Sequence, residues 1–169
     1  MASINKIELK DLQITERDDN SCVYAGFVAY KGEVLGRWMC DTGADRQSYE
    51  FDKDILRKEA GIIEKAINKE AGEPQYFSIN QLLLRLAKLT KTENEVKNAK
   101  KLGYMSVIYI DDGYNDEWIC SKIAARDVKL SEYYKKTLLP YIRNNFSEDV
   151  EVSISSTEDI FDIEYKEED

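Results

Sequence analysis

The chain of 169 residues contains no histidine. This absence excludes Ser–His and Cys–His nucleophile pairs, histidine general bases and histidine-ligated metal sites. Catalysis would have to rely on carboxylates, Lys, Tyr, Cys or Ser. We therefore expect a protein that is not an enzyme and that needs no metal or cofactor.

Long apolar runs are also missing. No stretch of 18 apolar residues exists, so the sequence predicts no membrane span. The first ten residues, MASINKIELK, lack the apolar segment of a signal peptide. The cysteines Cys22, Cys40 and Cys120 are odd in number, far apart and form no CxxC pair, which favours reduced thiols in a cytoplasmic protein.

Proline is scarce, with 2 residues, and no Gly/Ser-rich linker divides the chain. Hydrophobic residues make up 43%, which is too many for a disordered chain. The length suits one core. We expect a single domain over residues 1–169.

The first fifty residues read as strands. Alternating and β-branched residues predict strands at Lys6–Glu16 and Cys22–Tyr30, with a turn at Asp18–Asn20 between them. Lys31-Gly32 fits a tight hairpin that leads into Glu33–Cys40. A further short strand is expected at Ser48–Phe51.

The middle of the chain reads as helices. Asp52 can cap a first helix, which Gly72-Glu73-Pro74 ends. The segments Ser78–Gln81 and Thr92–Glu95 are both capping-box patterns and predict the starts of two more helices. Gly103 fits the position just after the last of these helices.

The last third returns to strands. The apolar run Tyr104–Ile110 predicts a central strand, with Glu117–Ala124 as its hairpin mate. A helix from about Ser131 should kink at Pro140. Closing strands are expected at Val150–Ser155 and Ile160–Tyr165. The predicted fold class is α+β: a mostly antiparallel sheet from N- and C-terminal strands, packed with about three to four helices.

One short motif carries a possible chemistry. Asp41-Thr42-Gly43-Ala44 resembles the active-site tetrapeptide of the retroviral-type aspartic proteases. The resemblance implies a homodimer in which two copies of Asp41 share a proton and activate water. A homodimeric aspartic peptidase is therefore the alternative function.

The resemblance covers only about a dozen residues. Asp45 is followed by Arg46-Gln47, which departs from the family, and the chain has neither its Gly-rich flap nor its later apolar-apolar-Gly segment. Asp-Thr-Gly is also favourable turn chemistry between two strands. We interpret the motif as a turn.

Two further sequence patterns could indicate a metal site, and both are weaker signals than the Asp41 motif. A nuclease core could combine Asp111 or Asp112 with Asp127-Val128-Lys129. The same acid-x-Lys pattern recurs at Glu8, Glu95 and Glu164, so it does not discriminate. Asp111–Glu117 has its glycine at the wrong position for a calcium-binding EF-hand loop, and we expect a hairpin loop there.

The net charge is −9 and is concentrated at the end of the sequence. Residues 145–169 contain ten acids against the single base Lys166, an excess that equals the net charge. The balance argues against direct nucleic-acid binding and favours a basic partner. The partner-binding residues we predict are Glu148, Asp149, Glu151, Glu158, Asp159, Asp162 and Glu164.

Carboxylates at every second residue of a strand lie about 6.6 Å apart, a spacing similar to that of nucleic-acid phosphates. We therefore expect a small acidic protein that inhibits a basic, nucleic-acid-binding partner by occluding it. Size and charge resemble those of phage inhibitors of the anti-restriction or anti-CRISPR kind and of toxin immunity proteins. The 11 tyrosines could contribute to such an interface, and a solubilising role for the acids is the simpler interpretation.

Overall fold

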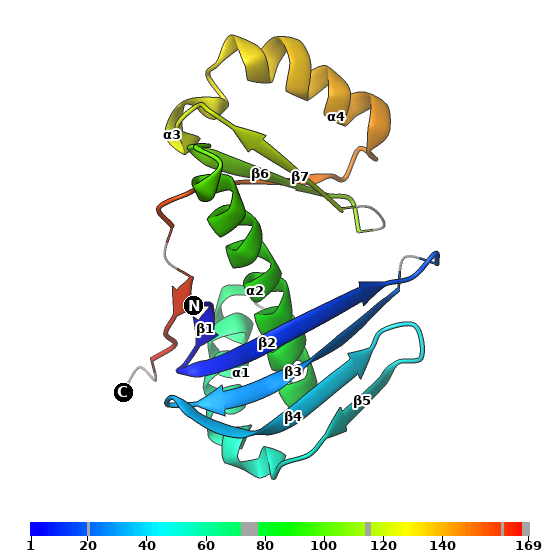
Figure 1. Ribbon diagram of the computed structural model, residues 1–169, viewed down its shortest axis with the longest axis vertical. Helices are drawn as coiled ribbons and strands as arrows, with labels where there is room; N and C mark the ends of the chain where they lie inside the picture. The colour runs from blue at the N-terminus through cyan, green and yellow to red at the C-terminus, as the bar shows by residue number, and fades with distance from the viewer. Residues whose placement is uncertain (20, 72–77, 114–115, 160, 167–169) are drawn as a thin grey trace. The chain divides into compact units, whose positions relative to one another are not determined.

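The computed structural model describes residues 1–19, 21–71, 78–113, 116–159 and 161–166 (Figure 1). Its strands form mostly antiparallel sheets and are combined with helices, so the predicted α+β class is confirmed. Contacts divide the chain into two compact units, Met1–Lys91 with Phe161–Asp169 and Thr92–Ile160, and the boundary falls inside helix α2 (Ile79–Lys101). We call them unit 1 and unit 2. The single domain expected over residues 1–169 stays a prediction.

Unit 1 is built on a six-stranded sheet with the order β5-β4-β3-β2-β1-β9. Its strands are β1 (Ser3–Ile4), β2 (Ile7–Glu16), β3 (Cys22–Tyr30), β4 (Glu33–Asp41), β5 (Arg46–Tyr49) and β9 (Asp162–Ile163). Neighbours are antiparallel except for β1 and β9, which run parallel. The expected single sheet is therefore only partly present: the C-terminal strand β9 joins the N-terminal strands, and the other strands of the last third form a separate sheet.

The predicted hairpin at Lys31-Gly32 is present between β3 and β4. Both residues have left-handed backbones, with φ of 51° and 85°. Two such residues in a row give a turn whose twist matches that of the flanking strands, and glycine adopts this conformation without strain. The β3 bounds are those predicted, and β4 extends one residue further than expected.

One face of this sheet is covered by helices. The 3₁₀ segment η1 (Lys53–Leu56) leads into α1 (Arg57–Ala71), and the Asp52 carboxylate accepts a hydrogen bond from the Asp54 amide, which confirms the predicted cap. Figure 1 shows α1 and α2 on the same side of β2–β5. The core of unit 1 includes Ile7, Val28 and Trp38 from the strands, and Leu56, Ile63, Leu82, Leu83 and Leu86 from the helices.

Helix α2 begins with the first predicted capping box. The Ser78 amide donates to Gln81 Oε1 at 2.7 Å, and the Gln81 amide donates to Ser78 Oγ at 3.3 Å. Gly103 ends the region as predicted: it has φ +79°, its amide donates to the Lys100 carbonyl, and the Tyr104 amide donates to the Ala99 carbonyl. This is the Schellman arrangement.

The second predicted helix start, at Thr92, is wrong. Helix α2 runs through Thr92–Glu95 without a break. No glycine or proline lies between the start of α2 and Thr92. Thr90, Glu93 and Val96 are all buried, so a stripe of inward side chains continues past Thr92. Tertiary burial of one continuous stripe outweighs the local capping preference.

Unit 2 contains a three-stranded antiparallel sheet with the order β7-β6-β8. Its strands are β6 (Ser106–Asp111), β7 (Asp116–Ser121) and β8 (Glu151–Ser156), and its helical segments after β7 are α3 (Ala125–Val128), η2 (Tyr134–Leu138) and α4 (Leu139–Asn145). The predicted central strand and its hairpin mate are present, but the central strand begins at Ser106 rather than Tyr104, and its mate ends at Ser121 rather than Ala124. Ile108 and Ile110 of β6 pack with Val128, Leu138 and Ile142.

Pro140 lies in the first turn of α4, directly after the π-helical turn η2. Proline has no amide hydrogen to donate to the carbonyl four residues earlier, so it is tolerated in the first turn of a helix and disrupts the regular hydrogen bonds of the turn before it. The helix predicted from about Ser131 is present, whereas the kink at Pro140 stays a prediction.

The last expected strand is shorter than predicted. β9 contains only Asp162 and Ile163. Ile160, the first residue of the predicted strand, lies outside the described residues. The predicted helix end at Gly72-Glu73-Pro74 and the tyrosines Tyr76 and Tyr114 also lie outside them. In the part of the chain that is described, no helix has the length and apolar character needed to cross a membrane.

Candidate functional site

The seven predicted partner-binding acids do not share one strand. Glu148 and Asp149 lie in the turn before β8, Glu151 begins β8, and Glu158 and Asp159 follow it. These five belong to unit 2, whereas Asp162 and Glu164 belong to unit 1.

Three of the seven already have partners. Glu158 Oε1 lies 2.7 Å from Lys100 Nζ, and Glu164 Oε1 lies 4.0 Å from Lys6 Nζ. The Asp162 carboxylate accepts a hydrogen bond from the Ser3 hydroxyl. By contrast, no described residue forms an ion pair with Glu148, Asp149 or Glu151.

The sheet register gathers further acids beside those three. Asp111 of β6 is directly opposite Asp116 of β7 and also opposite Glu151 of β8. Adjacent strands lie about 4.8 Å apart, so the three residues form a row across one end of the sheet. We call this end, with its flanking acids, the acidic sheet end: Asp111, Asp112, Asp116, Glu117, Glu148, Asp149 and Glu151.

The turn before β8 is tied to this end. The Ser147 amide donates to Asp112 Oδ2 at 3.3 Å, which brings the adjacent Glu148 and Asp149 toward the β6–β7 loop. Gly113, with φ +84°, allows its amide to donate to Asp111 Oδ1 at 2.7 Å. The hairpin interpretation of this loop therefore holds for the part of it that the structure describes.

Aromatic residues line the row of acids. Tyr109 stacks on Trp118 with ring centroids 4.3 Å apart, and its hydroxyl donates to Asp111 Oδ2 at 2.8 Å. Burial raises the pKa of Tyr109, and the hydrogen bond to Asp111 and the charges of Asp111, Asp116 and Glu151 raise it further. The three carboxylates therefore act together on one side chain.

Tyr141 is the exposed tyrosine among the described residues, with 38% of its surface accessible. Its hydroxyl donates to Glu117 Oε2 at 2.6 Å, and this hydrogen bond raises the pKa of Tyr141. It packs edge-to-face on Phe146. An accessible aromatic ring therefore borders the acidic sheet end, and other described tyrosines are at least half-buried.

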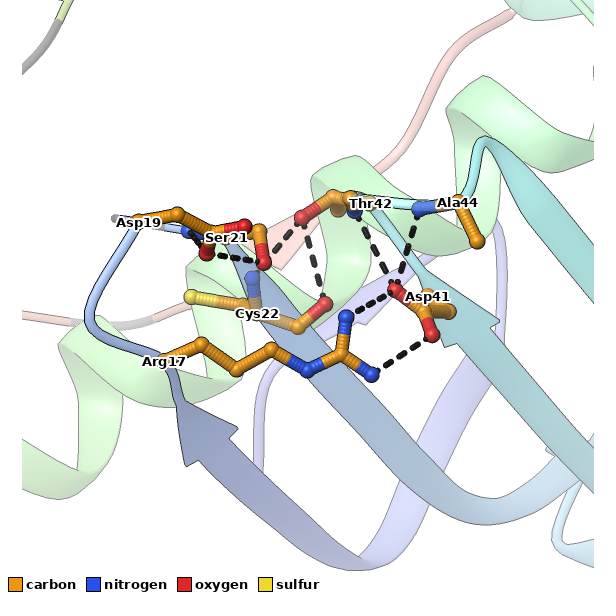
Figure 2. Close-up of polar contacts among 8 residues, drawn as sticks. Arg17, Asp19, Ser21, Cys22, Asp41, Thr42 and Ala44 are labelled. Atoms are coloured by element: carbon orange, nitrogen blue, oxygen red, sulfur yellow. Dashed lines mark hydrogen bonds and ion pairs between the residues drawn. The ribbon is translucent and has the colours of Figure 1, made fainter.

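The Asp41 motif forms the turn between β4 and β5 (Figure 2). Asp41 Oδ1 accepts hydrogen bonds from the amides of Gly43 at 3.1 Å and Ala44 at 3.2 Å, and Arg17 binds both carboxylate oxygens. Thr42 Oγ1 accepts from the Cys22 amide at 2.8 Å and so fastens the turn to β3.

This geometry favours the turn interpretation over the peptidase. A carboxylate that activates water needs an oxygen available to that water, whereas both oxygens of Asp41 are committed to a guanidinium. The hydrogen bond from Arg17 holds the pKa of Asp41 below its usual range.

Among the described residues, no group of three or more Cys, Asp or Glu is placed to hold a metal ion.

Comparison with protein-family models, with curated proteins and with solved structures finds no match to this chain. The function therefore has to be argued from its own residues.

The sequence interpretation missed Asp111, Asp112, Asp116 and Glu117 as members of the acidic site. They lie about thirty residues before the acid-rich end of the chain, and only strand pairing places them beside Glu151. The DDGYNDE loop was their visible signal, because a loop this acidic between paired strands concentrates charge at one sheet end.

Proposed function

We propose that this protein is a non-enzymatic binding protein that docks its acidic sheet end onto a basic, nucleic-acid-handling partner and occludes that partner's binding groove. The observation that supports the proposal is the row formed by Asp116, Asp111 and Glu151 on three adjacent strands. A row of carboxylates on a rigid sheet presents negative charge in fixed positions, as a nucleic-acid backbone does.

The neighbouring side chains fit an interface. Glu148, Asp149 and Glu151 make no ion pair with a described residue, so their attraction for an external cation is not offset within the protein. Tyr141 supplies an accessible aromatic surface that contacts Glu117 of the acidic sheet end. Interfaces combine such aromatic anchors with charges that steer association.

In this proposal Glu158, Asp159, Asp162 and Glu164 have a lesser role than their sequence position predicts. Two of them are neutralised by Lys100 and Lys6. The inhibitor would act in the cytoplasm, where its three free thiols remain reduced.

The experiment compares two variants with the same change in charge. The first carries Asp116→Asn, Glu148→Gln, Asp149→Asn and Glu151→Gln. The matched control carries Glu158→Gln, Asp159→Asn, Asp162→Asn and Glu164→Gln. Each is immobilised and used to capture proteins from a bacterial lysate at about 50 and 300 mM salt, with and without competing DNA.

We expect wild type and the control variant to retain the same basic nucleic-acid-binding protein. DNA and high salt should both release it, and the first variant should not retain it. If the control variant loses the partner and the first variant keeps it, the acids at the end of the sequence form the site. Retention of one partner by all three proteins contradicts occlusion by acids of either set.

A further inference from the structure

A small cavity lies in unit 1, where two hairpin turns meet at one end of the sheet. The first turn, Asn5-Lys6, joins β1 to β2, and the second, Lys31-Gly32, joins β3 to β4. The Lys31 amide donates to the Lys6 carbonyl at 2.9 Å, which fastens the two turns to each other. The cavity has a volume of about 190 Å³ and is lined by residues of both turns, of α1 and of the segment after β9. Four segments that are distant in the sequence therefore converge on it.

Asn5 lines this cavity with a side-chain amide that is only half used. The residue is 6% exposed, and its Oδ1 accepts a hydrogen bond from the Tyr165 amide at 2.7 Å. This contact fixes the orientation of the side chain, because a nitrogen in the place of Oδ1 would face another donor. The other end of the amide, Nδ2, is buried and has no acceptor in the described chain. A buried donor without an acceptor destabilises a fold, so the site lacks an oxygen atom at this point.

Two lysines border the cavity, one from each turn. Lys6 and Lys31 are exposed, and both have left-handed backbones, with φ of 63° and 51°, which is uncommon for lysine. Lys6 Nζ lies 4.0 Å from Glu164 Oε1, and both side chains are more than 60% exposed, so this is a weak pair. Lys31 Nζ lies 4.8 Å from the centroid of the Tyr30 ring and forms no ion pair with a described residue. Both ammonium groups are therefore available to an anionic ligand group.

Two carboxylates line the same cavity. Glu59 of α1 is partly buried, and its Oε1 accepts a hydrogen bond from the Tyr30 hydroxyl at 2.8 Å. It forms no ion pair with a described residue. Glu164 is the second carboxylate, and it is the partner of Lys6. Two lysines and two glutamates give the described lining a formal charge of zero, so the cavity combines separate cationic and anionic groups without an excess of either sign.

We propose that this cavity binds a small zwitterion of the α-amino acid type. The carboxylate of the ligand would accept a hydrogen bond from Asn5 Nδ2 and pair with Lys6 and Lys31. Its ammonium group would pair with Glu59. The proposal does not rest on the function proposed for the acidic sheet end, which belongs to unit 2.

The charge and the size of the cavity both restrict the ligand. A simple anion would be repelled by Glu59 and Glu164, and a simple cation by the two lysines, whereas a zwitterion can place each of its charges beside an opposite one. A volume of about 190 Å³ is room for roughly six groups of the size of water, at about 30 Å³ each. This favours an amino acid with a small side chain, such as alanine or serine, over a peptide or a nucleotide.

Isothermal titration calorimetry with the full-length protein at about pH 7 tests the proposal, with the standard L-amino acids as probes, one at a time. Propionate lacks the ammonium group of alanine and ethylamine lacks its carboxylate, so the two probes separate the charges. The test variants are Lys31→Gln and Glu59→Gln, and the second keeps an acceptor for the Tyr30 hydroxyl. The matched controls are Lys129→Gln and Glu50→Gln, because both residues are exposed and lie outside the lining of the cavity.

We expect at least one small amino acid to bind with a Kd of about 1 mM or lower, and propionate and ethylamine to bind at least about tenfold more weakly. Each test variant should weaken binding of the amino acid roughly tenfold or more, and each control less than about twofold. In NMR spectra, the assigned side-chain amide signals of Asn5 should shift on binding. The variant with four neutralised acids at the sheet end should bind as wild type does, which separates this proposal from the proposed function.

Three results would overturn the proposal. The first is that no amino acid binds at about 10 mM. The second is that propionate or ethylamine binds as tightly as alanine, which would identify a plain anion or cation site. The third is binding that both test variants leave unchanged, or that does not shift the Asn5 signals, which would place the ligand elsewhere. Lys6→Gln replaces a test variant that circular dichroism shows to be unfolded.

Discussion

Arg17 binds Asp41 through two parallel contacts, from Nη1 to Oδ1 at 2.8 Å and from Nη2 to Oδ2 at 2.7 Å. The contacts join the end of β2 to the end of β4 across β3. They give a structural reason for an aspartate at the first position of this turn that requires no catalysis. Two consequences can be measured.

The first prediction concerns acid stability. Arg17 lowers the pKa of Asp41 in the folded protein, so the ion pair stabilises the fold above the unfolded-state pKa, and this contribution is lost as the pH falls through the folded-state value. Asp41→Asn should therefore have a lower Tm than wild type at pH 7. The difference should shrink as the pH falls from about 5 toward 2.

Differential scanning calorimetry across this pH range gives the comparison. Asp45→Asn is the matched control, because Asp45 is exposed in the same turn and pairs with no described residue. A constant difference in Tm between Asp41→Asn and wild type at every pH contradicts a charge-dependent role for Asp41.

The second prediction concerns peptidase activity. Because Arg17 occupies both oxygens of Asp41, we expect no cleavage of a quenched fluorescent peptide library between about pH 3 and 7, where an aspartate pair is active. The informative control is Arg17→Gln, which frees the carboxylate but leaves the rest of the turn in place. Cleavage by wild type that Asp41→Asn abolishes would restore the peptidase alternative.

A third prediction concerns the start of α2. Ser78→Ala removes the hydroxyl that accepts from the Gln81 amide and should lower the free energy of unfolding by about 1 kcal/mol. Gln81→Ala removes the reciprocal bond to the Ser78 amide. Because the two bonds belong to one capping box, the double variant should lose less than the two single losses added together, as measured by urea unfolding. Fully additive losses would mean that the two bonds act independently.

The two capping-box patterns show where sequence reasoning succeeds and where it fails. Ser78 follows a Gly-Glu-Pro segment of the sequence and starts helix α2. Thr92 has the same capping-box pattern, but no glycine or proline shortly before it, and it lies inside that helix. The pattern states a local preference. Whether the preference is used depends on the burial of Thr90, Glu93 and Val96 along one stripe, which is a tertiary property.

The site shows the same limit at longer range. The charge of Glu151 is visible in the sequence, but its alignment with Asp111 and Asp116 depends on the order and register of three strands. Alternation with acids marks Phe161 and Ile163 as residues of one face, and both pack against the core. It could not predict that the chain after β8 returns to unit 1, where β9 pairs with β1.

A fourth prediction compares two glycines. A Cβ on Gly36 would lie 2.6 Å from the Glu50 carbonyl oxygen and 3.0 Å from Phe51 Cβ, so the backbone after β5 would have to move. Gly36→Ala should cost roughly 1–3 kcal/mol, in the range of overpacked sites. Gly61 lies in α1, where a Cβ meets no atom within 4 Å.

Gly61→Ala should therefore raise the free energy of unfolding by about 0.5–1 kcal/mol, because alanine loses less backbone entropy in a helix. Urea unfolding of both variants against wild type supplies the measurement. If the two substitutions changed the free energy of unfolding equally, a methyl group at Gly36 would not be more crowded than one at Gly61, and the prediction would be wrong.

The last prediction concerns alkaline pH. Burial raises the pKa of Tyr49 to about 12, and the negative charge of the ionised Cys40 thiolate adds to the effect. The ring packs edge-to-face on Phe51 with centroids 5.8 Å apart, and its hydroxyl contacts both Asn80 Oδ1 and Gln47 Oε1, the latter at 3.1 Å. Ionisation would place a charge among these partly buried groups.

A raised pKa in the folded state means that folding favours the neutral phenol. This contribution to stability is fully present below the unfolded-state pKa of about 10 and is lost as the pH rises through about 12. Absorbance at 295 nm should thus show a late tyrosinate step, and Tyr49→Phe should reduce it. In guanidinium chloride all tyrosines should titrate near the ordinary value. Suppose that Tyr49→Phe instead removes part of the 295 nm absorbance change near pH 10 in the folded protein. That result would mean that Tyr49 ionises at the ordinary tyrosine pKa, and that β5 packs less closely on the core than its contacts indicate.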